Sequence, residues 1–223
     1  MEANQNITEI ILTEKQKRYL PIKRAIDIVL SGGAIIVLSP VLVLISLAIR
    51  VDSPGPILFK QKRVGKNKEL FEILKFRTMC TNTPKDLPTH MLSNPEQYIT
   101  KIGKFLRKTS IDELPQIFNI FKGQMSIIGP RPALWNQYDL IAERDKYGAN
   151  DITPGLSGWA QVNGRDSIKI KDKAHLDGEY VKRLSAGFEV KIFILTIINV
   201  LNRSGVVEGG MGKINRVKEA REK

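Results

Sequence analysis

The sequence has little of what builds disulfide frameworks, metal centres and histidine-based active sites. Its one cysteine, Cys80, excludes an internal disulfide and a cysteine-rich zinc site, and we expect that thiol to be an inert small hydrophobe. The only histidines are His90 and His175, so we expect neither a histidine metal site nor a Ser-His-Asp triad. Acid chemistry would have to come from carboxylates and cations.

Negative charge is also scarce. Lysine and arginine number 35 against 23 aspartates and glutamates, which leaves a net charge of +12. An excess of this size favours an anionic partner, and nucleic acid, an anionic membrane surface or phosphorylated small molecules would all serve. The length of 223 residues is enough for one domain with a real hydrophobic core.

The most apolar part of the chain is the run of residues 25–49, AIDIVLSGGAIIVLSPVLVLISLAI, in which Asp27 is the only charged residue. As a straight helix the run would be roughly 37 Å long at about 1.5 Å per residue, enough to cross a hydrocarbon core of about 30 Å. It lacks the small-residue cleavage pattern of a signal peptide. We therefore predict a membrane segment. Asp27, near the start of this segment, could pair with the neighbouring Lys23 or Arg24.

Ser39 and Pro40 lie inside this run. A proline in a helix interior removes one backbone hydrogen bond and costs about 3 kcal/mol unless the helix bends. Both flanks are basic, from Lys15 to Arg24 and from Arg50 to Lys68. Because basic flanks prefer the cytoplasmic side, a single crossing would leave one flank outside. We therefore favour a re-entrant helix broken at Ser39–Pro40, with a simple span as the alternative.

The residues after the run are expected to form one compact unit. Residues 57–79 predict two strands joined by a Gly-Lys-Asn turn, residues 80–97 an exposed loop, and residues 154–165 a glycine-rich loop passing into a short strand. Helices are predicted over 99–106, from Leu114 to a stop at Gly123, over 174–184 on the surface, and over 190–201. The last is apolar on one side, which is typical of a helix lying on a membrane surface.

The most distinctive polar pair is Asp112 and Glu113, in RKTSIDELPQ, residues 107–116. The spacing of Ser110 and Glu113 matches a capping box. Pro115 favours a different start, because it would break a bond as the fifth residue of a helix capped by Ser110. With Asp112 as the cap it falls at the third position, where its missing donor would be free anyway. We therefore predict that Asp112 begins a helix, whose positive end favours both a carboxylate and an incoming phosphate.

Cations surround this pair in the sequence. Arg107 and Lys108 precede it, and the turn Gly129–Pro132 follows the expected helix. Two prolines around Arg131 leave its backbone little entropy to lose, which suits bidentate contact with a phosphate. Taken alone, the pattern also fits a capping aspartate with a solvated glutamate and a solvated turn arginine.

Several segments of the chain, taken in their order, resemble those of a known family. The segments KRAIDI, GPILFKQKRVG, ILKFRTM, LRKTSIDELPQIFNIFKGQMSIIGPRP and PGLSGWAQVNGR occur in this order, together with a membrane run that contains Ser-Pro. They resemble the bacterial sugar transferases, the monotopic phosphoglycosyltransferases that begin lipid-linked glycan assembly. The resemblance runs from about Lys23 to about Leu201 and is nearest to the short capsular-polysaccharide type, which lacks an amino-terminal multi-span domain.

The resemblance implies a mainly helical α/β fold on the cytoplasmic face of the bacterial cell membrane. A basic segment over 1–24 would precede a re-entrant helix over 25–49 broken at Ser39 and Pro40. A cytoplasmic catalytic domain with interfacial amphipathic helices would follow over 50–205, and a charged tail over 206–223. The partners implied are inner-membrane lipids and, as a possibility, downstream glycosyltransferases.

The resemblance also implies an activity. The family moves sugar 1-phosphate from a nucleotide sugar, usually a UDP-sugar, to undecaprenyl phosphate, with Mg²⁺ as cofactor, and releases UMP. The family's nucleophile maps to Asp112 and its Mg²⁺-holding glutamate to Glu113. Its phosphate-contacting arginine maps to Arg107, and the arginine of its nucleotide-associated Pro-Arg-Pro turn maps to Arg131, between Pro130 and Pro132.

Other protein classes explain less of the sequence. A nucleic-acid-binding protein would account for the charge but not for the apolar run, and the basic residues are not interleaved with aromatic ones. A catalytically inactive membrane scaffold for glycan assembly is the alternative, which the intact Asp112–Glu113 pair disfavours. The sequence specifies neither the sugar, the pathway nor the oligomeric state.

Overall fold

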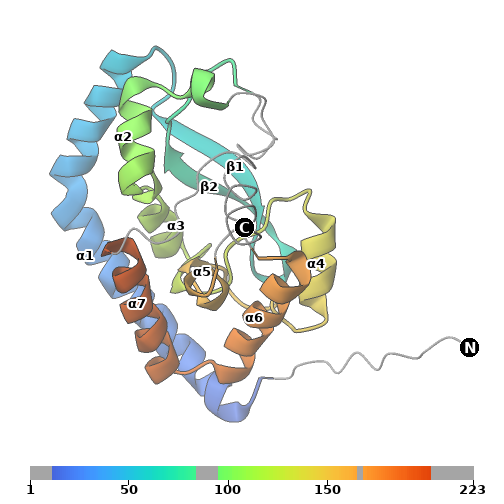
Figure 1. Cartoon of the computed structure of the whole chain (residues 1–223). Coiled ribbons are helices and arrows are strands. Elements are labelled where there is room, and N and C mark those ends of the chain that lie inside the picture. Colours follow the sequence, from blue (N-terminus) through green and yellow to red (C-terminus); the bar gives the residue numbers. More distant parts are fainter. Residues whose placement is uncertain (1–11, 84–94, 165–167, 202–223) are drawn as a thin grey trace, which may run out of the picture.

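The computed structural model describes residues 12–83, 95–164 and 168–201. The predicted charged tail, most of the predicted loop over 80–97 and Arg165 lie outside these ranges, as do the first eleven residues. Helices dominate the described part, and two small sheets of two strands each complete it (Figure 1). The prediction of a mainly helical α/β protein is confirmed.

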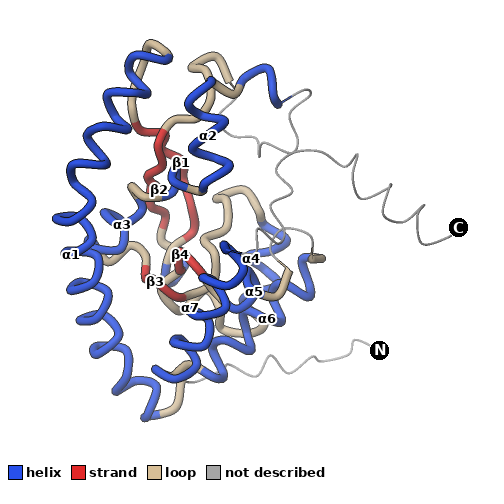
Figure 2. The backbone as a smooth tube through the Cα atoms, turned by 60° about the vertical axis from the view of Figure 1, so that its left-hand side comes forward, coloured by secondary structure: helices blue, strands red, loops and turns tan. Residues whose placement is uncertain are grey.

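The longest element is helix α1, Glu14–Asp52, which begins well before the predicted run. Thr13 caps it in a capping box with Gln16. At 39 residues it is roughly 58 Å long at about 1.5 Å per residue. It bows along one side of the molecule (Figures 1 and 2). Beside one half lie α2, Lys101–Thr109, and a strand hairpin over residues 58–76, and beside the other half lie α6, Ile170–Arg183, and α7, Ala186–Leu201.

The helix remains continuous through Ser39 and Pro40. Pro40 cannot donate a backbone hydrogen bond to the carbonyl of Ile36, but the Ser39 hydroxyl donates to that carbonyl at 2.8 Å. A serine side chain can in this way satisfy a group that a proline leaves free in an apolar helix. The predicted break is therefore not confirmed as an interruption of the helix, and the re-entrant path stays a prediction.

Helix α1 is long and apolar enough to cross a membrane, with a mean hydropathy of 2.7 over its most apolar window and 11% of that window buried. Large apolar side chains are exposed along most of it. They include Ile22, Ile26, Val29, Leu30, Ile36, Val37, Val43, Leu44 and Leu47. Burying this much apolar surface in lipid would be favourable, which agrees with a membrane segment.

Both ends of α1 are nevertheless bound to the same folded unit. Near the amino end, Arg24 donates to the carbonyls of Ile120 and Phe121 at 2.6 and 2.7 Å. At the carboxyl end, an Asp52 carboxylate oxygen accepts from the backbone N–H of Ile102 at 3.0 Å. The carboxyl half of α1 packs as well, since Leu42 and Ile49 belong to an apolar cluster with Phe76, Leu106 and Ile117.

The predicted ion pair of Asp27 with Lys23 or Arg24 is wrong. The buried Asp27 carboxylate accepts from the backbone N–H of Ile127 at 3.0 Å. Lys23 pairs with Glu189 at 2.7 Å instead. Asp27 therefore ties α1 to the body of the protein instead of balancing a neighbouring charge.

The predicted strand pair is confirmed. Strands β1, Leu58–Val64, and β2, Leu70–Phe76, are antiparallel, with Leu58 opposite Phe76. The turn η1, Lys66–Lys68, joins them, with Asn67 in the left-handed region. After η3, Pro95–Tyr98, helix α2, Lys101–Thr109, packs between this hairpin and α1 (Figure 1).

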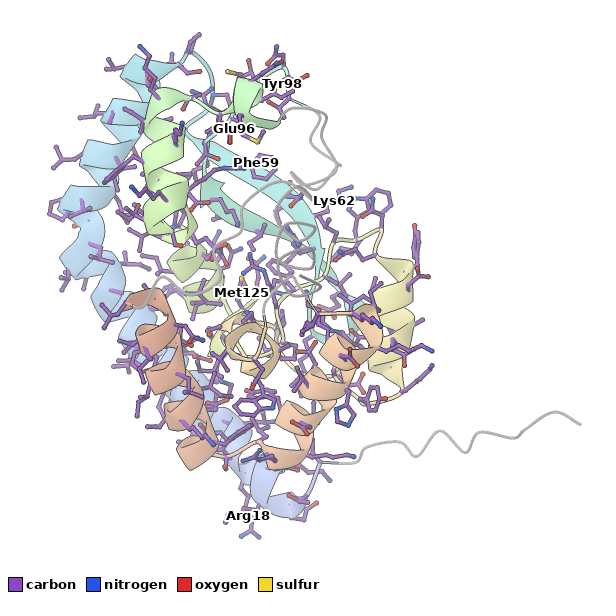
Figure 3. All side chains as sticks on the ribbon, in the orientation of Figure 1. Arg18, Phe59, Lys62, Glu96, Tyr98 and Met125 are labelled. Carbon is purple, nitrogen blue, oxygen red and sulfur yellow. The ribbon has the colours of Figure 1, made fainter. Side chains whose placement is uncertain are left out.

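Two short helical elements follow α2. The first is the 3₁₀ turn η4, Ile111–Glu113, and the second is the α-helix α3, Gln116–Lys122. Gly123 ends α3 with a left-handed φ of 86°, which confirms the predicted stop. Beyond it Met125 is almost fully buried and lies near the centre of the molecule in Figure 3.

The second sheet pairs β3, Ser126–Ile128, with β4, Gly155–Ser157, in parallel, and α4, Tyr138–Asp145, lies between them in sequence. The predicted order in the glycine-rich segment is wrong, because the strand comes first and helix α5, Trp159–Val162, follows it. The start of β4 and the residue after β3 lie so close together that a Cβ on Gly155 would clash with the Gly129 nitrogen.

The last two helices are α6, Ile170–Arg183, and α7, Ala186–Leu201. The expectation of an exposed helix over 174–184 is wrong, because α6 buries Asp177 against Arg144 and Gly178 against Tyr147. Helix α7 has, as predicted, an apolar side that remains exposed. Ile192 is buried, while Phe193 and Ile197 are about half exposed.

The contact between Gly129 and Gly155 yields a prediction. Gly155→Ala should destabilise the protein by about 3 kcal/mol, the upper part of the range for overpacking, because its new methyl group meets backbone that cannot give way. Gly187→Ala is the control, since a Cβ there meets nothing within 4 Å. Thermal unfolding in detergent, followed by circular dichroism, measures both. Equal melting temperatures for Gly155→Ala and the unsubstituted protein would contradict the predicted clash.

Candidate active site

Asp112 and Glu113 lie on the 3₁₀ turn η4 between α2 and α3. Ser110 adopts a left-handed conformation with φ 57° and ends α2. The predicted helix start at Asp112 is wrong, because α3 begins at Gln116 with Pro115 in the cap position. The alternative capping box at Ser110 is also not formed, since Ser110 makes no side-chain cap bond. The backbone N–H groups of Glu113 and Leu114 instead donate hydrogen bonds to carbonyls three residues earlier. This 3₁₀ turn places both carboxylates one turn before α3.

The Glu113 carboxylate joins two cations from distant parts of the chain. Its Oε1 atom accepts from Lys75 Nζ at 2.6 Å and from an Arg131 guanidinium nitrogen at 3.0 Å. Lys75 comes from β2, and Arg131 from the loop after β3. One carboxylate oxygen therefore brings together the turn η4, the first hairpin and the second sheet.

The surroundings of Glu113 stabilise its ionised form. Burial alone would raise the pKa of this carboxyl, but the charges and hydrogen bonds of Lys75 and Arg131 outweigh burial and hold the pKa far below its ordinary value of 4.5. Glu113 is therefore an anion at any physiological pH. It orients two cations instead of carrying a proton.

The loop that carries Arg131 is fixed on both sides. The carbonyl of Pro130 accepts from the Gly155 N–H at 2.9 Å, and the carbonyl of Pro132 accepts from Arg63 at 3.1 Å. Pro130 and Pro132 are buried, while the Arg131 side chain is 31% exposed. The prediction of a rigid turn presenting an arginine is thus matched by the backbone contacts, with Glu113 as the side-chain partner.

Arg107 occupies the last turn of α2, and its guanidinium faces the segment after β2. Its Nε donates to Thr78 Oγ1 at 2.9 Å, and one terminal nitrogen lies 3.3 Å from the sulfur of Met79. This segment continues directly from the strand that carries Lys75. Arg107 therefore contacts the segment after β2, and the helix that carries it leads through Ser110 to the turn with Asp112.

Lys75 is the site residue that the sequence reasoning missed. Side chains in a strand alternate between two faces, so Lys75 shares a face with Phe71 and Ile73. Both of those residues are buried. A lysine on the buried face of a strand needs an anionic partner. That pattern could have identified Lys75 before the structure was known.

The oxygen donors of this site suit a hard cation. Within the described ranges no group of three or more His, Cys, Asp or Glu side chains is placed to hold a metal. Mg²⁺ commonly takes only one or two protein carboxylates and completes its shell with water and substrate phosphates. Asp112 and Glu113 supply two carboxylates on one turn, which fits such a site. Together with Lys75, Arg107 and Arg131, the pair also suits a phosphorylated substrate.

Comparison with known proteins gives the site a context. The sequence model of the family described as bacterial sugar transferase matches residues 18–203. One relative is the UDP-glucose:undecaprenyl-phosphate glucose-1-phosphate transferase of Escherichia coli (strain K12), 40% identical over 79% of this chain and 39% of the relative. Another is the UDP-N-acetylgalactosamine-undecaprenyl-phosphate N-acetylgalactosaminephosphotransferase of Aeromonas hydrophila, 38% identical over 84% of this chain and 45% of the relative.

A third relative, an uncharacterized sugar transferase of Bacillus subtilis (strain 168), is 39% identical over 74% of this chain and 81% of its own length. The chain spans about two fifths of the length of the first curated relatives that it matches.

The low pKa of Glu113 predicts how acid affects stability. A carboxyl whose pKa is lowered by folding stabilises the protein fully above its unfolded value, here about 4.5, and loses that contribution as the pH falls toward the folded value. Glu113→Gln should therefore cost about 2 kcal/mol near neutral pH, as for a hydrogen bond to a charged group. Below about pH 4.5 the difference from the unsubstituted protein should shrink.

Thermal melts at a series of pH values measure this difference. Glu14→Gln is the control, because it removes an exposed pair with Lys17 and should change little at any pH. A difference between Glu113→Gln and the unsubstituted protein that stayed constant or grew in acid would contradict the lowered pKa.

Proposed function

This chain belongs to the bacterial sugar transferase family, and on that premise we propose that it moves sugar 1-phosphate from a UDP-sugar to undecaprenyl phosphate. The products are an undecaprenyl diphosphate sugar and UMP, and the step would begin the assembly of a capsule or another lipid-linked glycan. The observation that carries the proposal is the cluster of Asp112, Glu113, Lys75 and Arg131. The match to the family over residues 18–203 includes this cluster.

Asp112 is the proposed nucleophile. Its carboxylate oxygen attacks the sugar-bearing phosphorus of the UDP-sugar, the bond from that phosphorus to the bridging oxygen breaks, and UMP leaves with the electron pair. An oxygen of undecaprenyl phosphate then attacks the same phosphorus of the acyl phosphate, which restores the Asp112 carboxylate. Covalent catalysis of this kind divides one difficult transfer into two easier ones. Asp112 is half-buried on η4, so the residue is partly exposed to solvent.

The surrounding cations would reduce the electrostatic repulsion between the anionic reactants. A carboxylate and a phosphate acceptor both repel a diphosphate, and charge grows on the phosphate oxygens in the transition state. In the proposal Arg131 contacts the nucleotide diphosphate, Arg107 contacts a phosphate beside Asp112, and Lys75 keeps Glu113 in place. Glu113 holds Arg131 before substrate arrives, which reduces the entropy lost on binding.

Mg²⁺ is the proposed cofactor. Glu113 would help to hold it, and the ion would neutralise charge on the substrate phosphates when bound. Lys75 and Arg131 already contact one Glu113 oxygen. Each can shift its contact to a substrate phosphate, because both are cations that bind phosphate as readily as carboxylate.

We also propose a monotopic arrangement on the cytoplasmic face of the cell membrane, with inner-membrane lipids around α1. Both ends of α1 bind the same folded unit, through Arg24 and Asp52, so a crossing that separated them would break one set of contacts. The exposed apolar side chains of α7 support contact with the lipid surface. This placement brings a lipid phosphate and a soluble nucleotide sugar to one site.

Asp112→Asn should lower the rate of UMP release by on the order of 10³-fold or more, because the amide cannot act as the nucleophile. The assay uses undecaprenyl phosphate, Mg²⁺ and a panel of UDP-sugars, since the names of the Escherichia coli and Aeromonas hydrophila relatives specify different donors. Asp139→Asn is the matched control, an exposed aspartate on α4. Normal UMP release by Asp112→Asn would overturn the nucleophile assignment. A chain that releases no UMP with any donor would favour the scaffold alternative.

The monotopic arrangement predicts that both ends of α1 lie on the cytoplasmic side of the membrane. In a Cys80→Ser background, single cysteines at the exposed positions Lys15 and Lys60 should both resist a membrane-impermeant maleimide in intact spheroplasts. Both should react after lysis. Reaction of one position from outside and the other only after lysis would establish a crossing helix.

A further inference from the structure

A buried polar cluster lies outside the active site, where α1, α6 and α7 meet (Figure 1). At its centre Glu189 of α7 pairs with Lys23 of α1 at 2.7 Å. The hydroxyl of Tyr19 donates to the other Glu189 oxygen at 2.7 Å, and the hydroxyl of Tyr180 also reaches the carboxylate. Lys23, Glu189 and Tyr180 are each less than a tenth exposed. No step of the proposed reaction uses these groups.

The cluster also reaches the backbone of β3. Lys23 Nζ lies 2.9 Å from the carbonyl oxygen of Ile128, and the Tyr180 hydroxyl lies 3.1 Å from it. Burial and the neighbouring Glu189 raise the pKa of Tyr180, so the phenol keeps its proton. The Tyr180 hydroxyl has a single proton and can donate it to only one acceptor. The shorter of its two contacts is the one with the Glu189 carboxylate, so we assign the proton to that hydrogen bond. Lys23, with three N–H groups, is therefore the donor that holds the Ile128 carbonyl.

Asp27 acts on the preceding residue of β3. It lies four residues after Lys23, on the same face of α1, and accepts from the Ile127 N–H. One face of α1 thus binds consecutive backbone groups of β3, an N–H through Asp27 and a carbonyl through Lys23. These are the last two residues of the strand before Gly129.

The loop that begins at Gly129 carries Arg131. From its other side the loop is held by Gly155 and Arg63, and its arginine reaches Glu113. The position of Ile128 therefore sets where the loop enters the site. We propose that Lys23 is a positioning residue, which acts through the Ile128 carbonyl to hold Arg131 in place and couples the site to the docking of α1. Its effect on turnover rests on the proposed function, whereas its effect on Arg131 does not.

A purely structural role for the same cluster makes a different prediction. A buried ion pair is weak evidence for stability, because well-packed apolar residues often replace it without loss. If Lys23 only fills space and balances charge, an apolar replacement of the cluster should leave the site unchanged. If it positions the loop, the same replacement should keep the fold and disturb Arg131.

The test variant is the triple substitution Lys23→Met, Tyr180→Phe and Glu189→Leu in the full chain. It removes both possible donors to Ile128 without leaving a buried charge unpaired. The matched control is Glu14→Gln with Lys17→Met, which removes an ion pair from the exposed face of the same helix. The control protein should melt close to the unsubstituted protein in detergent. The triple variant should melt lower but remain folded, because the Ile128 carbonyl and the Tyr19 hydroxyl lose their partners.

Two measurements then distinguish a role of Lys23 in positioning Arg131 from a role in stability alone. The first is the rate at which phenylglyoxal modifies Arg131, followed by peptide mass spectrometry, with Arg50 as the internal reference. In the triple variant Arg131 should react severalfold faster while Arg50 is unchanged, because the loop no longer holds Arg131 against Glu113. The control variant should change neither rate.

The second readout is the kcat/KM for the UDP-sugar. It should fall by on the order of tenfold or more in the triple variant. In an Arg131→Lys background the same three substitutions should cost less than about twofold, because residues that act through one another are not additive.

An unchanged Arg131 rate in a folded triple variant would overturn the proposal, as would an equal loss of kcat/KM in both backgrounds. If the unsubstituted protein releases no UMP with any donor, the proposed function fails and the phenylglyoxal rate still decides the role of Lys23.

Discussion

The arrangement of the site depends on one carboxylate oxygen. Oε1 of Glu113 receives Lys75 from the first hairpin and Arg131 from the loop after β3, and the turn that carries Glu113 also carries Asp112. Without that anion, two cations would face each other in a partly buried space, in a chain whose net charge is already +12. The paired cations in turn keep Glu113 ionised. In the proposed function, these cations are thus held in place before any phosphate is bound.

Helix α1 imposes the second constraint. Its exposed face is apolar enough for lipid, while its other face is bound to the folded unit through Lys23, Arg24, Asp27 and Asp52. Lys23, Arg24 and Asp27 are therefore more than general membrane-flanking charges, because each binds a backbone group of α3 or β3. The proposed reaction between a lipid phosphate and a soluble nucleotide sugar would use this combination, because its site would have to stay at the membrane surface while its loops keep a fixed geometry.

Local sequence rules predicted the elements that depend on neighbouring residues. Gly123 ends α3 because a left-handed φ suits glycine, and the alternation of residues 57–79 produces the β1–β2 hairpin. The rules failed where distant contacts decide. Asp27 binds Ile127, a hundred residues later in the chain, and α6 is buried because Asp177 meets Arg144 of α4. Asp112 was expected to cap a helix, but a left-handed Ser110 inserts a 3₁₀ turn first. Of the site, the family resemblance named Glu113 and Arg131 but not the ion pair that joins them, which depends on the distant packing of η4 against the loop after β3. Lys75 could have been found from the alternating faces of its strand.

The central claim is that Asp112 carries the sugar phosphate between donor and acceptor, and the adduct itself is its most direct test. The purified chain is incubated with a UDP-sugar and Mg²⁺ in the absence of undecaprenyl phosphate, and intact-protein and peptide mass spectrometry follow. The account predicts a mass increase of one sugar phosphate on the peptide containing Asp112, which disappears when undecaprenyl phosphate is added. Release of one equivalent of UMP with an unmodified Asp112 peptide, or an adduct on another residue, would contradict it.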